Sequence, residues 1–124
     1  MNITIRTIPH KSQPYSDVGD WFVNEEGLQI RVSDLSAPDY EFLIGVHELI
    51  ESWLCLRRKL TDETVTMYDV NFIRQHGNGE VPGEDPQCPY RDEHRIALSI
   101  EKTLCHYMGL SWTDYERHWT KFFT

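Results

Sequence analysis

Residues 36–60, with the sequence SAPDYEFLIGVHELIESWLCLRRKL, constrain the fold more than any other segment, because they predict one long amphipathic helix. Apolar residues recur at helical spacing, at Phe42, Leu43, Val46, Ile50 and Leu54. Ser36 or Asp39 suits the N-cap position, and Pro38 suits the first turn. A helix of this kind gains most of its stability by packing its apolar stripe against other elements.

Strands are predicted before this helix. Residues 2–8 alternate as a strand does, with Ile3 and Ile5 on one face. Residues 20–34 predict a β-hairpin whose turn is formed by residues 24–27. Three residues of its second strand are expected to face inward: Leu28, Ile30 and Val32.

Helices dominate the rest of the chain. Residues 90–109 predict a second long helix, and residues 111–119 predict a short final one. Residues 61–75 fit either a short helix or an extended segment, and both remain open. Residues 76–90 are rich in Gly and Pro, so we expect an irregular loop there.

The order of these elements, strands first and helices after, favours an α+β fold. The length of 124 residues suits a single domain covering residues 1–124. We expect a small antiparallel β-sheet, made of the N-terminal strand and the hairpin. This sheet would pack on two long helices and a short C-terminal helix.

The formal net charge of −8 disfavours binding to a nucleic-acid backbone and favours cations, including metal ions. The start of the chain lacks the features of a signal peptide, and no apolar run approaches the length of a membrane span. Cys55, Cys88 and Cys105 are odd in number, which favours reduced thiols. We therefore expect a cytoplasmic protein with no membrane partner.

Two of the predicted helices place a His and a Glu among apolar residues. In the first helix, His47 falls about 40° and Glu51 about 80° from Leu43, so both lie in or beside the stripe. In the later helix, Glu101 falls about 20° from His94, within a second apolar stripe. Buried charges are costly unless they are paired or bound to a metal.

A bound metal ion would compensate the buried charges of these side chains. The sequence HELIE differs by one residue from HExxH, in which two His bind zinc and the Glu is the general base. We predict that His47, Glu51 and His94 hold a divalent metal, most simply Zn, with Mn or Fe as alternatives. Glu48 is the predicted general base. Two residues are predicted to support the site or to add a ligand, namely Glu101 and Asp69.

Three other readings stay open. The His and Glu residues also fit a buried polar network that holds no ion. Glu48 and Glu51 match the ExxE half-motif of all-α pyrophosphohydrolases that hold Mg²⁺, although the N-terminal strands do not fit that fold. Cys88, in the loop, is the one thiol worth testing as a nucleophile.

From Trp21 onward the chain resembles a family of small uncharacterised phage and bacterial proteins with an HELxE helix. The stretches that carry the resemblance are YEFLIGVHELIESWLC, YDVNF, PGEDPQCPYRDEHRIALSIE and LSWTDYE. This resemblance implies a location in a bacterium or in a phage-infected host cell, and it supports the choice of His and Glu residues.

The stretch YEFLIGVHELIE is also similar to the helix of minimal zincin-like metallopeptidases, which reads roughly LLHELxH. That similarity implies Glu48 as the base and His47 as a ligand, with Glu51 in the place of the second His. Two functions follow as expectations. One is a metal-dependent hydrolase. The other is a non-enzymatic binding or inhibitor protein, with a small-molecule, peptide or protein partner and a structural metal or a buried His/Glu core.

Overall fold

The predicted hairpin is present. In the computed structural model, which describes residues 1–123, β2 (Gly19–Asn24) and β3 (Gly27–Ser33) are antiparallel. Gly27 closes the turn with a φ of +115°, a conformation that glycine adopts readily. The three inward positions of β3 are at most 1% exposed, as predicted: Leu28, Ile30 and Val32.

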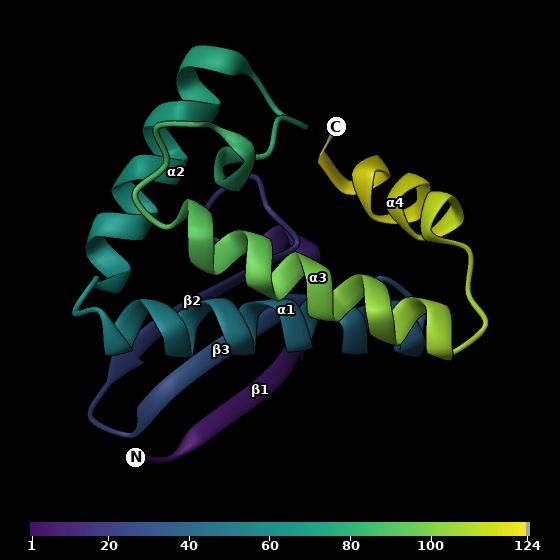
Figure 1. Cartoon of the computed structure of the whole chain (residues 1–124), viewed down its shortest axis with the longest axis horizontal. Coiled ribbons are helices and arrows are strands. Elements are labelled where there is room, and N and C mark those ends of the chain that lie inside the picture. Colours follow the sequence, from purple (N-terminus) through teal and green to yellow (C-terminus); the bar gives the residue numbers. More distant parts are fainter. Residues whose placement is uncertain (124) are drawn as a thin grey trace.

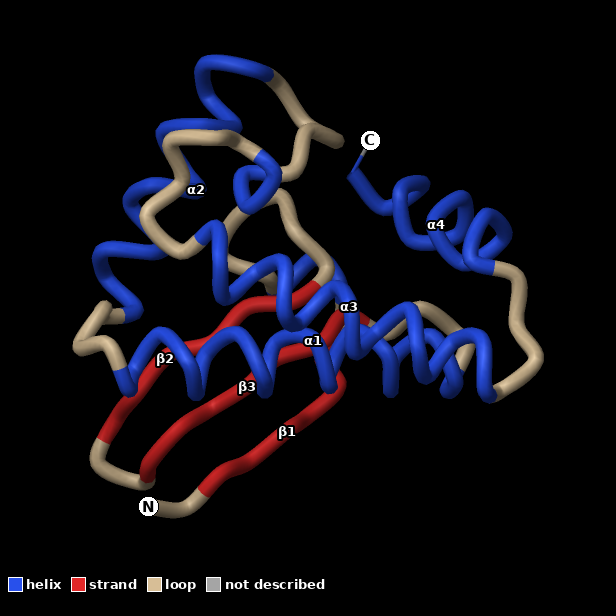
Figure 2. Tube along the Cα trace, in the orientation of Figure 1, coloured by secondary structure: helices blue, strands red, loops and turns tan. Residues whose placement is uncertain are grey.

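The sheet is mixed, and the prediction of an antiparallel sheet is wrong for its first strand. The order is β1-β3-β2, and β1 (Ile3–Ile8) runs parallel to β3 (Figure 2). After β1 the chain skips the neighbouring position in the sheet and forms β2 in the position beyond it, which leaves a gap beside β1. The hairpin then places β3 in the gap between them. Because β2 runs opposite to β1 and β3 is antiparallel to β2, β3 runs parallel to β1.

Helix α1 (Pro38–Arg57) is the long helix predicted from its period. It begins at Pro38 with Ala37 as the N-cap residue, so neither predicted cap is used. Glu41 instead accepts the backbone N–H of Leu35 at 2.8 Å, just before the helix. Helix α3 (Arg91–Tyr107) lies beside α1 and runs in the opposite direction (Figure 1), while α1 also packs on β2 and β3. Helix α1 is therefore enclosed by other elements on more than one side.

This enclosure shifts the buried face of α1 away from the predicted stripe. Leu43 is fully buried, but Phe42 is 51% exposed, and Val46, Ile50 and Leu54 are only half-buried. Several further buried positions are small or polar: Gly45, Glu48, Glu51, Ser52 and Cys55. The side of α1 that faces the interior therefore carries the candidate functional residues.

The segment left open by its sequence is a helix, α2 (Asp62–His76), so the protein has a third helix of considerable length. The short α4 (Trp112–Thr120) follows α3, and Ser111 caps it by accepting the N–H of Asp114 at 3.2 Å. Short 3₁₀ turns are present at η1 (His10–Ser12), η2 (Pro82–Glu84) and η3 (Lys121–Phe123). The α+β fold class is confirmed. Within residues 1–123, no helix has both the length and the apolar character needed to cross a membrane.

Candidate metal centre

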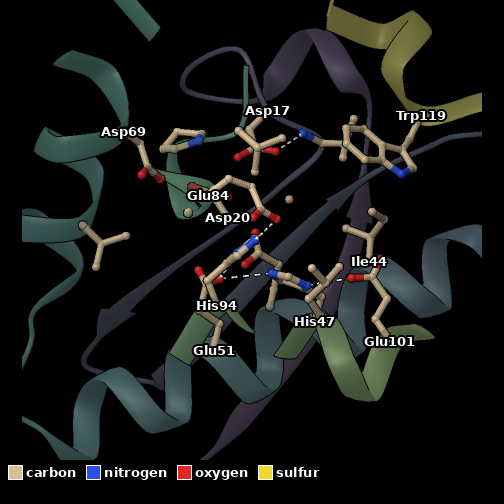
Figure 3. A pocket seen from close by; sticks show the side chains of 18 of the residues that line it. Asp17, Asp20, Ile44, His47, Glu51, Asp69, Glu84, His94, Glu101 and Trp119 are labelled. Carbon is tan, nitrogen blue, oxygen red and sulfur yellow. Dashed lines mark hydrogen bonds and ion pairs between the residues drawn. The ribbon is translucent and has the colours of Figure 1, made fainter. Parts of the chain in front are cut away.

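The antiparallel packing of α1 and α3 brings together the three predicted metal ligands. His47 and Glu51 stand one turn apart on α1, and His94 lies in the first turn of α3. Each of these residues offers a ligand atom, and these atoms lie within 4.8 Å of one another. Glu51 Oε2 lies 3.0 Å from His47 Nε2 and 3.1 Å from His94 Nδ1 (Figure 3). These residues, called the histidine group below, could hold a metal ion.

Each imidazole of the histidine group also contacts a second carboxylate through its other ring nitrogen. His47 Nδ1 lies 2.6 Å from Glu101 Oε1, and the hydroxyl of the fully buried Tyr115 donates to Glu101 Oε2. His94 Nε2 lies 3.2 Å from Glu84 Oε1. Imidazoles that bind metals commonly have such a carboxylate on the nitrogen that faces away from the ion, where it fixes the ring orientation. Glu101 thus contacts a member of the histidine group, and its supporting role stays a prediction.

Electrostatics within the histidine group keep its carboxylate ionised. Burial opposes a charge on Glu51, but hydrogen bonds from His47 and His94 lower the pKa of Glu51 to about 2. Burial likewise opposes protonation of His47, yet its hydrogen bonds to Glu101 and Glu51 raise the pKa of His47 well above its usual value. The imidazolium of His47 thus stands between the carboxylates of Glu101 and Glu51.

Glu48, the predicted base, lines the same cavity as the histidine group, although it projects about 100° from His47 on the helix. It is only 8% exposed, and its carboxylate has no hydrogen-bond partner within residues 1–123. Its side chain packs over Gly19, where an added Cβ would lie 3.0 Å from Glu48 Oε1. Burial, followed by the charge of Glu51, raises the pKa of Glu48 well above its usual value.

Asp69, predicted as a supporting or additional ligand, lines the cavity but does not belong to the histidine group. The hydroxyl of Tyr15 donates to Asp69 Oδ2 at 3.0 Å, and the hydroxyl of Tyr90 donates to Asp69 Oδ1. Burial, followed by the charge of Asp17, raises the pKa of Asp69 well above its usual value. Two neutral donors therefore satisfy this carboxyl group.

The cavity has a volume of about 200 Å³ and is lined by residues of β2, of the helices α1, α2, α3 and α4, and of the loops before β2 and around η2. Three lining residues were not predicted from the sequence: Asp17, Gly83 and Glu84. Asp17 and Glu84 lie on loops whose position the hydrophobic period does not define. The Pro-Gly pair before Glu84 was a sequence signal for the loop that contains Glu84. Gly83 has no side chain there, and an added Cβ would lie 2.4 Å from the His94 ring.

Burial disfavours the thiols as an alternative catalytic centre. Cys55, Cys88 and Cys105 are free and buried, in agreement with the prediction of reduced thiols. Burial raises the pKa of Cys88 to about 12, which leaves almost no thiolate at neutral pH. Cys88 is therefore a poor nucleophile, although its loop borders the site.

Comparison of the chain with protein-family models, with curated proteins and with solved structures gave no match. The resemblances noted from the sequence stay predictions, and the geometry of the cavity is the basis for assigning a function.

Proposed function

We propose that the protein is a metal-dependent hydrolase whose ion is held by His47, Glu51 and His94. The observation that carries the proposal is the convergence of these three side chains, from two helices, with ligand atoms within 4.8 Å. The cavity beside them has room for a small substrate group and for water.

The donor set fits a transition metal. Two imidazole nitrogens and one carboxylate oxygen form a set that zinc binds in catalytic sites, which leave a further coordination position open. Manganese and iron accept the same ligands, so they are the alternatives to zinc. When bound, such an ion supplies Lewis-acid polarisation of the scissile group and makes a nearby water more acidic.

The role proposed for Glu48 is that of general base. Its carboxylate is buried, has no hydrogen-bond partner within residues 1–123 and lines the same cavity as the three ligands. It would take a proton from water as the water oxygen bonds to the electrophilic carbon. It would return this proton to the leaving group as the scissile bond breaks. Glu101 and Tyr115 would hold the ring of His47 in place, and Glu84 would do the same for His94.

The experiment compares zinc-loaded wild type with Glu48→Gln on a panel of fluorogenic ester, amide and peptide substrates. Loss of a general base lowers the rate by about 10²–10⁴-fold, while the metal content should stay equal because Glu48 is not a ligand. Glu116→Gln is the matched control, since this exposed residue lines the same cavity and loses the same charge. Absence of wild-type activity on the whole panel, or full activity of Glu48→Gln, would contradict the proposal.

The second candidate function is a binding or inhibitor protein with a structural metal or a His/Glu polar core. The observation in its favour is that His47 already has a carboxylate on each ring nitrogen, so the network is satisfied by protein groups alone. This candidate predicts a protein without hydrolytic activity, in which Glu48→Gln changes neither metal content nor partner binding.

A further inference from the structure

The cavity wall is strongly acidic beyond the histidine group. Glu is the commonest residue type among its described lining residues, Asp adds to it, and Lys102 is the single Lys or Arg. One of these carboxylates, Asp20, is neutralised by Arg31, whose Nε lies 2.9 Å from Asp20 Oδ1. The wall has more acidic than basic residues, so its ionised carboxylates repel phosphate and carboxylate ligands and attract cations.

Asp17 is an acidic residue of this wall whose compensation comes from backbone N–H groups. Its Oδ1 accepts the backbone N–H of Val18 at 2.7 Å, and it has no cationic partner within residues 1–123. Figure 3 shows Asp17, Asp69 and Glu84 on the same side of the two histidines. Glu48 lies in the same cavity, is nine-tenths buried and has no hydrogen bond to the described part of the chain. Within residues 1–123, Asp17 and Asp69 therefore have no Lys or Arg partner in this part of the cavity.

Two buried donors in the cavity have no acceptor among residues 1–123. The indole N–H groups of Trp21 and Trp119 have no hydrogen-bond partner in the described chain, and both residues line the cavity. Trp21 is only 4% exposed, so bulk water does not readily satisfy its N–H. A buried donor without an acceptor is costly, and a carbonyl oxygen of a ligand would remove this cost.

The aromatic lining also suits an ammonium group. The ammonium of Lys102 already lies over the ring of Trp112, with Nζ 5.3 Å from the ring centroid. Both residues line the cavity. The protein thus holds one primary ammonium group against this wall by a cation–π contact.

We propose that the substrate carries a primary ammonium group next to an amide carbonyl, as the amino-terminal residue of a peptide or an amino-acid amide does. The ammonium group binds at Asp17, and the carbonyl oxygen accepts from a buried indole N–H. This inference rests on the proposed function, because it names the substrate class of the same site. It places the scissile amide on the side of the cavity that contains Glu48 and the histidine group.

The test measures binding of L-leucinamide and N-acetyl-L-leucinamide to the metal-free full chain, by calorimetry and by tryptophan fluorescence. The two probes share the side chain and the amide, and only the first carries an ammonium group. L-leucinamide should bind at least about tenfold more tightly, because a hydrogen bond to a charged group contributes about 1.5–3 kcal/mol. Asp17→Asn, which keeps an acceptor for the N–H of Val18, should abolish this preference. Glu116→Gln should retain it.

Equal binding of the two probes, or no binding of either, would overturn the inference. Retention of the preference in Asp17→Asn would overturn the assignment to Asp17, and circular dichroism checks that this variant is folded. Metal-free protein cannot carry out a metal-dependent cleavage, so binding is measured without turnover. If this substrate class is wrong, the metal content of the protein and the effect of Glu48→Gln on hydrolysis are still as proposed. If the proposed function is wrong, those two measurements fail as well.

Discussion

Glu51 and Asp69 line the same cavity and are equally buried, at 6% and 5% exposure, yet their partners differ in chemistry. Glu51 contacts two imidazoles, whose hydrogen bonds outweigh burial and lower the pKa of Glu51 to about 2. Asp69 contacts two tyrosine hydroxyls, and burial raises the pKa of Asp69 well above its usual value. The comparison shows that the partners, more than the depth of burial, decide whether a buried carboxyl group stays ionised and available to a cation.

The largest effect on stability is expected at Asp69, because its role in this comparison is structural. Asp69→Ala leaves the buried hydroxyls of Tyr15 and Tyr90 without their acceptor, which should lower the free energy of unfolding by about 3 kcal/mol. Urea denaturation measures this change. Asp69→Asn keeps one acceptor and should cost less. Loss of zinc from a folded Asp69→Asn variant would show that Asp69 is a ligand after all.

The second effect concerns metal affinity rather than stability. Glu101→Gln replaces the carboxylate that contacts His47 Nδ1, and this should weaken zinc binding by about 10–100-fold. Competition with a chromophoric chelator measures the affinity. Tyr115→Phe removes only the hydrogen bond to Glu101, so its effect should be smaller and in the same direction. An unchanged affinity in Glu101→Gln would argue against a metal at His47.

A smaller effect on stability and zinc binding is expected at Gly83, in the loop that covers His94. In Gly83→Ala the new Cβ would lie 2.4 Å from the His94 ring, so the loop or the ring must move. The expected cost is about 1–2 kcal/mol in stability, accompanied by weaker zinc binding. Gly45→Ala is the matched control, because its Cβ would meet Ile5 Cγ2 at 3.4 Å, an ordinary contact. Equal behaviour of the two variants would show that the loop does not support His94.

The smallest effect is expected at the thiols. Since burial raises the pKa of Cys88 to about 12, its thiolate fraction at pH 8 is about 10⁻⁴. The reaction of the folded protein with a thiol reagent should therefore be slow at pH 7 and accelerate by about tenfold per pH unit up to pH 9. Unfolding in guanidinium should expose all three cysteines at once. Rapid modification of Cys88 in folded protein at pH 7 would contradict this account.

Parts of the fold were predictable because local signals define them. The hairpin has a glycine turn and strict alternation at Leu28, Ile30 and Val32, and all three residues are buried. The direction of β1 relative to β3 was not predictable in this way. It depends on which strand position the loop after β1 leaves free, and no residue pattern within β1 encodes that choice.

The candidate site was also predictable only in part. The one-turn spacing of His47 and Glu51 fixes their common face, and a stripe on a second helix pointed to His94. Glu84 and Asp17 were missed because they lie on loops, where hydrophobic period carries no information about side-chain direction. The burial of Glu48 could not be predicted from the sequence either, because it follows from the packing of α1 against more than one element.

The most direct measurement of the central claim is elemental analysis of protein purified without a histidine tag, comparing wild type with a His47→Ala, His94→Ala double variant. The account predicts close to one zinc, manganese or iron ion per wild-type chain and none in a double variant that remains folded by circular dichroism. Wild-type protein that stays free of metal even after incubation with zinc, or a double variant that keeps its metal, would contradict it.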